Sequence, residues 1–490
     1  MLTRRRFVGY SALSSAMLTY PPLLRSGLGQ TAAPRPPLRL AILGSVYRRE
    51  SNLQAIADRF LVGYPYEGEW HMPNVQVVSL YMDRQALRAD AVPTDFNQAN
   101  LATGRQGVQR APAAAGAQGS QGTPTPGAGA AGAQAAGAQR PPAELGPTSD
   151  LSRARSQQFG FRVYNNIQGA LRCGGDRIAV DAVLSVVEQD GDSPYPSNER
   201  GQVLLPRYDF FQQCVQVFEE EGHAVPYFNH KQLSFSFTEA QSMVKTAERL
   251  KFPLLAGSSM PVTWRLPDVD IPLGAQVQEA VMVGAGGFDG MDFDALEAMQ
   301  CMLERRKGGE TGVKAVQLLE GNDVWVAQRA GRWSMDLLSS ALSRSDTPLG
   351  LTMLDARTQD LAAPGVLEQL VPNPAAYCIE YTDGTRATLL MLNGAIRDFN
   401  ISARVAGHGL VSTQFLMLPF LNETYSTCLA AKIEQMDLTR SAPYSVQRTL
   451  LTTGLLEACL NSRHRLNQRL ETPQLAISYQ PPAESQYART

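Results

Sequence analysis

The stretch Leu38–Asn52, LRLAILGSVYRRESN, decides how the rest of the chain is interpreted. Its apolar run ends at Gly44, as the first strand of a nucleotide-binding βαβ unit does. A G-x-G-x-x-G fingerprint would place two more glycines after it, but Ser45, Val46 and Tyr47 follow instead. The turn is therefore either a variant phosphate-binding turn or an ordinary connection from strand to helix.

Both interpretations of this turn have a physical basis. The second glycine of the fingerprint lets the backbone approach a pyrophosphate, and Val46 puts a branched side chain there. An anion can still bind the N–H groups at the start of the following helix, and Arg48 and Arg49 could add phosphate contacts. We therefore predict Gly44, Ser45 and Val46 as cofactor-binding residues, the alternative being a plain turn with two solvated arginines.

Composition narrows the function classes. The chain has 490 residues, 44% of them hydrophobic and 18% charged, which fits two or three globular domains. The formal net charge of −2 gives no field that would attract nucleic acid, so we expect no nucleic-acid partner. The six cysteines form no C-x-x-C pair and the five histidines have no chelating spacing with them, so no metal site is expected. Widely spread cysteines indicate buried apolar residues more than a disulfide framework.

The N-terminus resembles an export signal. Residues 3–9 read TRRRFVG, similar to the twin-arginine consensus, and a short, mildly apolar segment follows. Small residues near 31–33 could form a cleavage site, so residues 1–33 are predicted as a signal read by the twin-arginine translocase. The expected location is the periplasm or another exported compartment. The alternative is a basic, disordered N-terminus that carries no targeting signal.

Beyond the opening turn, strands alternate with helices. A helix with Leu53, Ile56, Ala57, Phe60 and Leu61 on one face and a buried strand, Val75–Asp83, come first. Residues 102–147 are dominated by Ala, Gly, Gln and Pro and are predicted to be a disordered insertion. Alternation then resumes up to about residue 260. This pattern predicts an α/β domain over residues 37–260, a Rossmann-type doubly wound parallel sheet.

The second half has a different pattern. AYCIEYTDGTRATLLML contains Asp383-Gly384 between two apolar runs, a strong hairpin signal. Further strand-like runs and one long helical run follow, and residues 475–479, LAISY, resemble a last strand. Residues 261–480 are therefore predicted to form an α+β domain with a largely antiparallel open sheet.

Several segments together resemble the Gfo/Idh/MocA family, which includes glucose–fructose oxidoreductase and inositol dehydrogenase. They are FGFRVYNNIQGAL (159–171), DAVLSVVE (181–188) and HAVPYFNHKQLSFSFTEAQSMVKTAERLKFPLLAG (223–257). The last is similar to the family's E-K-P block, and the likeness extends over roughly residues 38–479, apart from the insertion. It implies a Rossmann domain joined to an α/β domain whose open sheet often mediates oligomers, so a homo-oligomer is expected.

The resemblance also implies site residues. Lys231 aligns with the lysine of E-K-P, which would hold the substrate oxygen and share its proton; His230 and Gln232 replace the glutamate and proline. Asp294 falls about where the family has a catalytic histidine, and Asp292 and Glu297 could line the same site. The alternative is that these acids interact with the dipole of a helix N-terminus.

Asp83, at the end of the second strand, could bond a ribose hydroxyl and favour NAD over NADP. It is a predicted cofactor-binding residue, although the loop before it is longer than usual. The alternative is a polar residue that ends a strand.

The leading hypothesis is an exported oxidoreductase that moves a hydride between NAD or NADP and a sugar, polyol or related carbohydrate. Because free cofactor is scarce outside the cytoplasm, the cofactor would be tightly bound. The alternative is a non-catalytic secreted carbohydrate-binding or assembly protein on the same fold, favoured by the missing glycines and the altered E-K-P tripeptide.

Overall fold

The computed structural model describes residues 36–83, 150–188, 194–349, 361–417 and 425–489. Residues 37–490 form one compact unit. The predicted export signal, residues 1–33, and the low-complexity segment 102–147 lie outside the described residues. Within the described ranges, no helix has both the length and the apolar character needed to cross a bilayer.

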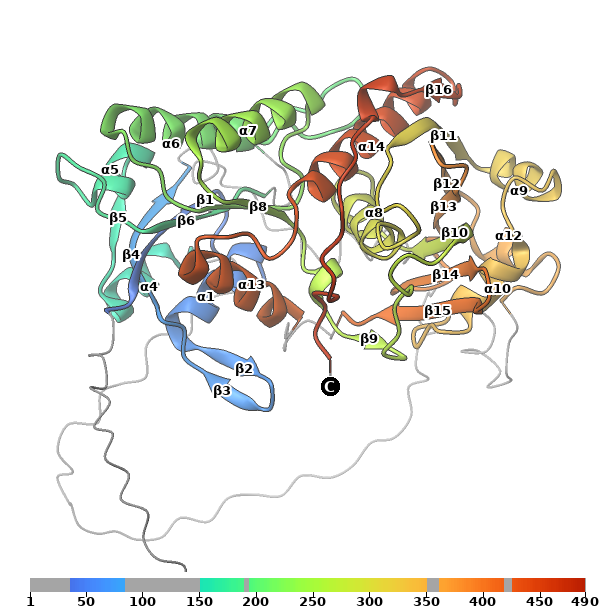
Figure 1. The fold of residues 1–490 in the computed structure, drawn as a ribbon, viewed down its shortest axis with the longest axis horizontal. Coiled ribbons are helices and arrows are strands. Elements are labelled where there is room, and N and C mark those ends of the chain that lie inside the picture. The colour runs from blue at the N-terminus through green and yellow to red at the C-terminus, as the bar shows by residue number, and fades with distance from the viewer. Residues whose placement is uncertain (1–35, 84–149, 189–193, 350–360, 418–424, 490) are drawn as a thin grey trace, which may run out of the picture. The chain divides into compact units, whose positions relative to one another are not determined.

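The first sheet is parallel throughout and has six strands in the order β5-β4-β1-β6-β7-β8. Numbered within the sheet, this order is 3-2-1-4-5-6, that of the Rossmann fold, and it confirms the predicted doubly wound sheet (Figure 1). The strands are β1 (Leu38–Gly44), β4 (Val75–Met82), β5 (Arg162–Tyr164), β6 (Ala182–Val186), β7 (Tyr227–His230) and β8 (Leu254–Gly257).

Helices cover both faces of this sheet. The predicted apolar face of α1 is buried at Leu53, Ile56, Ala57 and Phe60, and the Ser51 hydroxyl caps the helix by accepting the Gln54 N–H. One face of the sheet is covered by α5, α6 and α7, the other by α1 and α13 (Figure 1). These helices and the neighbouring α4 are α1 (Asn52–Val62), α4 (Ser152–Phe159), α5 (Ile167–Arg172), α6 (Arg207–Glu221), α7 (Phe237–Leu250) and α13 (Tyr425–Thr439).

The second sheet has eight strands in the order β16-β11-β12-β13-β10-β14-β15-β9. Only β10 and β13 pair in parallel, so the sheet is largely antiparallel, as predicted. The hairpin predicted at Asp383-Gly384 is the β12–β13 pair. The strands are β9 (Arg265–Leu266), β10 (Val277–Gly284), β11 (Val313–Glu320), β12 (Ala375–Tyr381), β13 (Arg386–Met391), β14 (Phe399–Val405), β15 (Gly409–Phe415) and β16 (Leu470–Glu471).

The predicted last strand, residues 475–479, is wrong. Leu475 ends a short 3₁₀ helix, η2 (Pro473–Leu475), and in this run Tyr479 alone forms a bridge, with Glu310. The edge position is taken by β16 instead, which pairs with β11.

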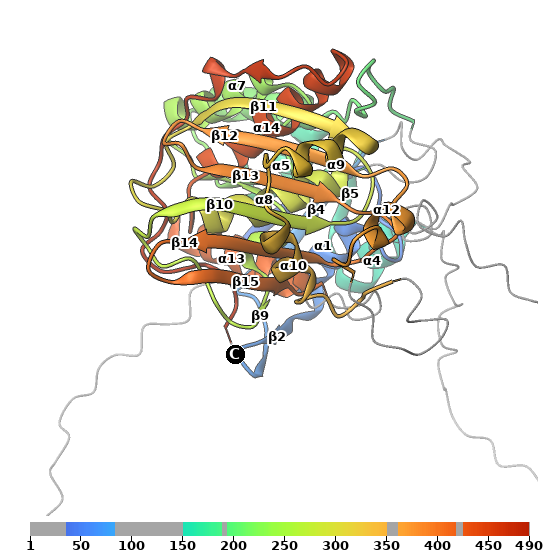
Figure 2. The same cartoon turned by 90° about the vertical axis from the view of Figure 1, so that its right-hand side faces the viewer.

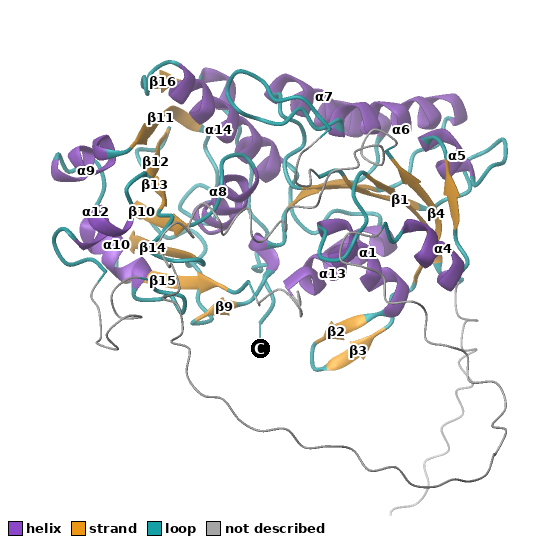
Figure 3. Ribbon diagram, turned by 180° about the vertical axis from the view of Figure 1, so that it is seen from behind, coloured by secondary structure: helices purple, strands orange, loops and turns teal. Residues whose placement is uncertain are grey.

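The second sheet also has helices on both faces. Helices α8 (Gly290–Leu303) and α14 (Gln447–His464) cover the face that turns toward the first sheet, as the view from behind shows (Figure 3). The opposite face is covered by α9 (Asn322–Arg329), α10 (Met335–Leu342) and α12 (Val366–Leu370), in front of the strands in Figure 2. Helix α8 is thus placed to carry side chains from the second half to the edge of the first sheet.

Helix α13 belongs to the second half of the sequence but packs in the first half. Its residues share a core with β1 and α1. Glu434 of α13 accepts bonds from the hydroxyl of Tyr64, 2.8 Å away, and the backbone N–H of Asn74, 2.8 Å away, and contacts the His71 ring. Tyr64 and His71 lie in the hairpin of β2 (Tyr64–Tyr66) and β3 (Glu69–His71). The parts of the sequence before and after residue 260 therefore contact each other through α13.

All six cysteines lie in the described residues, and all are free; five are buried. Five of the six are thus buried as apolar residues are, and Cys173 is half-buried. Among the described residues, no group of three or more His, Cys, Asp or Glu is arranged to hold a metal ion.

Candidate functional site

The predicted site residues fall into two groups at the carboxyl ends of the parallel strands, where ligands bind in open α/β sheets. Lys231 directly follows β7 and meets Asp294, which α8 brings from the second half. Gly44, Ser45 and Asp83 lie where β1 and β4 end. The structure therefore joins Lys231 of the first half to Asp294 of the second.

Lys231 is held from both ends. Its backbone N–H donates to the Gly257 carbonyl, 2.9 Å away, and its φ of 63° lies in the left-handed region. Its Nζ donates to Asp294 Oδ2, 3.1 Å away, and to the Gly290 carbonyl, 3.2 Å away. A lysine with a left-handed φ carries some backbone strain, and these hydrogen bonds hold it in that conformation.

Asp294 is buried beside this ammonium. Burial raises the pKa of its carboxyl, and the positive charge of Lys231 opposes the rise. Its other oxygen, Oδ1, is enclosed and has no hydrogen-bond partner among the described residues. The pair can therefore hold or pass a proton.

Arg207, which begins α6, is the cation that sequence analysis missed. It is only 3% exposed, and its guanidinium forms no hydrogen bond or ion pair with any described residue. Burial lowers its pKa to about 10, although Asp289, Glu188 and Asp294 attract it through space. A buried, unpaired charge is costly, so this arginine is a candidate ligand contact. One signal in the sequence could have found it. Arg207 precedes Phe210 and Cys214 of the buried stripe of α6 by three and seven residues, a spacing that puts it on the buried face of the helix.

Further polar groups surround Lys231 and Arg207. Gln232 donates through Nε2 to Asp289 Oδ1, 2.8 Å away, and burial keeps His230 neutral by lowering its pKa. Five buried side-chain atoms in this cluster have no hydrogen-bond partner in the described structure: Arg207 Nε, Asn229 Oδ1, His230 Nδ1, Gln232 Oε1 and Asp294 Oδ1. The cluster thus offers donors and acceptors together.

The three acids of α8 have different hydrogen-bond partners. Asp292 accepts a hydrogen bond from the Tyr377 hydroxyl under the second sheet, and burial raises its pKa to about 8. Glu297 accepts from the Ser258 N–H, 2.6 Å away, and from the Thr449 hydroxyl, 2.9 Å away, and burial raises its pKa to about 7. Of the three, Asp294 alone bonds Lys231. Positions 292 and 294 lie on opposite faces of the helix, whereas Glu297 lies on the face of Asp294, and Ser258 lowers the pKa of both acids.

The turn between β1 and α1 is closed by contacts within the chain. A Cβ at Gly44 would lie 2.4 Å from Leu53 Cδ2, so the glycine is needed for close packing of α1. The Ser45 hydroxyl donates to the Glu188 carbonyl, 2.7 Å away, and accepts the Glu188 N–H, 2.8 Å away. Val46 is half-buried in the turn, and Tyr47 is buried in the core beneath it.

The N-terminus of α1 already holds a carboxylate. Glu188 Oε2 accepts from the Asn52 N–H, 3.1 Å away, and from Asn52 Nδ2, 2.6 Å away, and Oε1 accepts from the Leu53 N–H, 2.9 Å away. Burial raises the pKa of Glu188, and these donors lower it. The following N–H, of Gln54, donates to the Ser51 hydroxyl.

Asp83 is also bound within the chain. Its backbone N–H donates to the Gly44 carbonyl, 2.9 Å away, and its Oδ2 accepts from the Tyr195 hydroxyl, 2.7 Å away. The N–H groups of α1 and the acid that ends β4 are the two anchors that a Rossmann fold offers a dinucleotide. Because both have partners from this chain, the residues present do not fit a dinucleotide in that pose.

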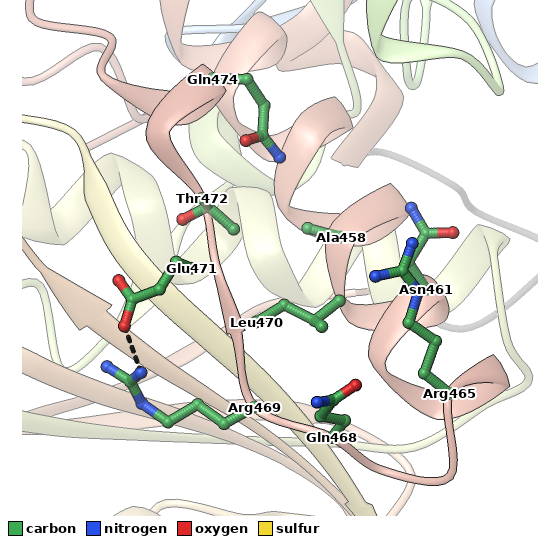
Figure 4. A pocket seen from close by; sticks show the side chains of 9 residues that line it. All are labelled: Ala458, Asn461, Arg465, Gln468, Arg469, Leu470, Glu471, Thr472 and Gln474. Atoms are coloured by element: carbon green, nitrogen blue, oxygen red, sulfur yellow. Dashed lines mark hydrogen bonds and ion pairs between the residues drawn. The ribbon is translucent and has the colours of Figure 1, made fainter.

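A separate pocket of about 330 Å³ lies at the end of α14 (Figure 4). Arg469 there pairs with Glu471 and Glu380. None of the predicted site residues lines it, and nine residues do: Ala458, Asn461, Arg465, Gln468, Arg469, Leu470, Glu471, Thr472 and Gln474.

Comparison with known proteins gives a likeness in fold. No protein-family model and no curated protein matches the sequence. The solved structure of GenD2 from gentamicin A biosynthesis in complex with NAD is 12% identical, with 89% of this chain and 97% of that one covered and a TM-score of 0.47. Myo-inositol dehydrogenase from Lactobacillus casei, in complex with NAD(H) and myo-inositol, is 9% identical, with 89% of this chain and 96% of that one covered and a TM-score of 0.45. A Gfo/Idh/MocA family oxidoreductase from Vibrio cholerae is 11% identical, with 88% of this chain and 100% of that one covered and a TM-score of 0.42.

Proposed function

We propose that this chain binds a small polyhydroxylated molecule, a sugar or polyol, between Lys231, Asp294 and Arg207. The observation that carries the proposal is the buried guanidinium of Arg207, which has no hydrogen-bond partner among the described residues. Folding buries such a group at a cost, and a ligand that bonds it offsets that cost.

The mixture of free atoms favours hydroxyl groups in the ligand. Each hydroxyl both donates and accepts, so one molecule with several of them can bond Arg207 Nε and the oxygens of Asp294 and Gln232. The Lys231 ammonium can hold one ligand oxygen while it remains bonded to Asp294. An apolar or purely anionic ligand would leave the orphaned acceptors without partners.

An oxidoreductase is the second candidate, favoured by the 3-2-1-4-5-6 strand order and by the Lys231–Asp294 pair at the edge of that sheet. It would transfer a hydride between a sugar or polyol and NAD or NADP. In this account Lys231 would hold the reacting oxygen and Asp294 would take up its proton. The partners already present at α1 and at Asp83 oppose it, so we rank it second.

We also propose that the protein is exported through the twin-arginine route, on the strength of Arg4, Arg5 and Phe7. Replacement of Arg4, Arg5 and Arg6 by lysine should retain the protein in the cytoplasm. Cell fractionation tests this, and undiminished export of the triple variant would refute it.

Calorimetric titration with a panel of hexitols, inositols and aldoses tests the proposed function. The wild type should bind at least one of them, and Lys231→Met should lower its affinity at least about tenfold, since the ligand loses its charged contact. Lys251→Met is the matched control, because Lys251 also has a left-handed φ, 58°, but is exposed. Absence of binding to the whole panel, or an equal loss in both variants, would refute the proposal.

The oxidoreductase candidate is tested with the same ligands. Each is incubated with NAD⁺ or NADP⁺, and absorbance of the reduced cofactor is followed. We expect none above background. Turnover that Lys231→Met abolishes would establish the second candidate instead.

A further inference from the structure

We infer that two described residues of the connection between β6 and α6, Glu188 and Tyr195, fill with their side chains the place in which this fold holds a dinucleotide. The Glu188 carboxylate occupies the place of the pyrophosphate, and the Tyr195 hydroxyl occupies that of a ribose hydroxyl. The inference goes beyond sugar binding, because it concerns the ends of β1 and β4 rather than the end of β7 and explains the altered turn at Gly44.

The carboxylate of Glu188 makes the contacts that a phosphate would make. A phosphate at a helix N-terminus is bonded by the first free N–H groups and attracted by the helix dipole. Here the Asn52 and Leu53 N–H groups, 3.1 and 2.9 Å away, both donate to this one carboxylate. The Asn52 side chain adds a third bond, of 2.6 Å. With Glu188 in place, these donors are not available to an external anion.

Tyr195 makes the contact of a ribose hydroxyl. In the Rossmann fold the acid that ends the second strand accepts a hydrogen bond from the ribose. Asp83 occupies that position, after β4, and accepts from the Tyr195 hydroxyl at 2.7 Å. Both substitutes thus come from one connection, Glu188 at its start and Tyr195 farther along.

The turn holds Glu188 in this place. The Ser45 hydroxyl is bonded to both the N–H and the carbonyl of Glu188, at 2.8 and 2.7 Å. The side chain therefore extends from a backbone that is fixed against β1. The glycines that a pyrophosphate would require beyond Gly44 are not needed, because the carboxylate comes from Glu188, two residues after the end of β6.

Titration with inorganic pyrophosphate tests the inference. Isothermal calorimetry would compare the wild type with Glu188→Ala, which frees the two N–H groups. We expect no measurable binding to the wild type and at least about tenfold tighter binding to Glu188→Ala. Glu188→Gln keeps the side-chain volume and should lie between them, so it serves if the alanine variant folds poorly.

A double variant controls for the place of binding. Proline is tolerated at the first position of a helix, and Ser51 has the extended backbone (φ −74°, ψ 153°) that a following proline requires. Asn52→Pro removes one donor without breaking α1, so Glu188→Ala with Asn52→Pro should lose most of the gained affinity.

Equal pyrophosphate binding by the wild type and Glu188→Ala would overturn the inference. Failure of both Glu188 variants to bind, or undiminished binding by the double variant, would overturn it too. The sugar titrations of the wild type and Lys231→Met judge the proposed function separately, so failure of this inference and failure of sugar binding are distinguishable.

Discussion

Arg207 is the residue whose replacement best separates function from stability. Burial lowers its pKa to about 10, so its charge destabilises the folded chain in the absence of a ligand. Arg207→Met should raise the free energy of unfolding by on the order of 1–3 kcal/mol and lower sugar affinity at least about tenfold. Thermal unfolding and calorimetric titration measure the two effects.

Arg153→Met is the control, since Arg153 is exposed on α4 and should change neither quantity. A destabilised Arg207→Met variant with normal sugar affinity would show that Arg207 supports the fold through the acids around it.

Glu297 should govern part of the pH dependence of stability. Burial raises its pKa from 4.5 to about 7, so the folded state binds the proton more tightly than the unfolded state. Its contribution to stability is present below pH 4.5 and is lost as the pH rises to about 7. Glu297→Gln should remove this loss and gain about 2 kcal/mol over the wild type between pH 5 and 8.

Urea unfolding at several pH values measures this gain. The exposed Glu484→Gln is the control and should follow the wild type throughout. A Glu297→Gln variant with the wild-type pH profile would contradict the assignment.

Individual site residues differ in whether the sequence predicts them. Lys231 and Asp294 were predicted from their place in a resembling motif, and the structure joins them. Glu188 and Arg207 were not predicted, because their partners or neighbours lie far away in sequence; Glu188 is 136 residues from Asn52. A lone acid after a strand gives no sign of which helix it will reach.

At the scale of elements, the β1–α1 unit is held by a close contact. A Cβ at Gly44 would lie 2.4 Å from Leu53 Cδ2, and Gly44 has no left-handed φ that would itself require glycine. Gly44→Ala should cost about 1–2 kcal/mol by overpacking, and Leu53→Ala about 2–4 kcal/mol by leaving a cavity. The double variant should cost at least about 0.5 kcal/mol less than the sum, because the smaller side chain admits the new methyl group.

A double-mutant cycle in urea measures this coupling. Strictly additive costs would contradict the contact. Sugar binding of Gly44→Ala should remain unchanged, since Gly44 lies at a different strand end from Lys231.

Elements with a clear period were predicted well. The alternating runs of the first half and the Asp383-Gly384 hairpin correspond to β6, β7 and the β12–β13 pair. The last strand was misplaced, because the apolar run at 475–479 is used for core packing by Leu475 rather than for pairing. Short apolar runs do not distinguish these two uses.

On the scale of the whole molecule, the halves are more entangled than the sequence indicated. A boundary near residue 260 separates the sheets, but α13 returns to pack on α1, and α8 brings Asp294 to Lys231. No local pattern in the sequence of α13 indicates where it packs. Its burial against α1 and the bond from Tyr64 to its Glu434 both depend on the assembled first half. The candidate site therefore could be predicted only where a motif matched.

If Glu188 and Tyr195 occupy the place of a dinucleotide, the folded protein carries none. Mass spectrometry of the folded protein, purified gently from cells and then denatured, tests it most directly. We expect no NAD or NADP above trace level in the released fraction. A nicotinamide dinucleotide released in about one copy per chain would contradict it.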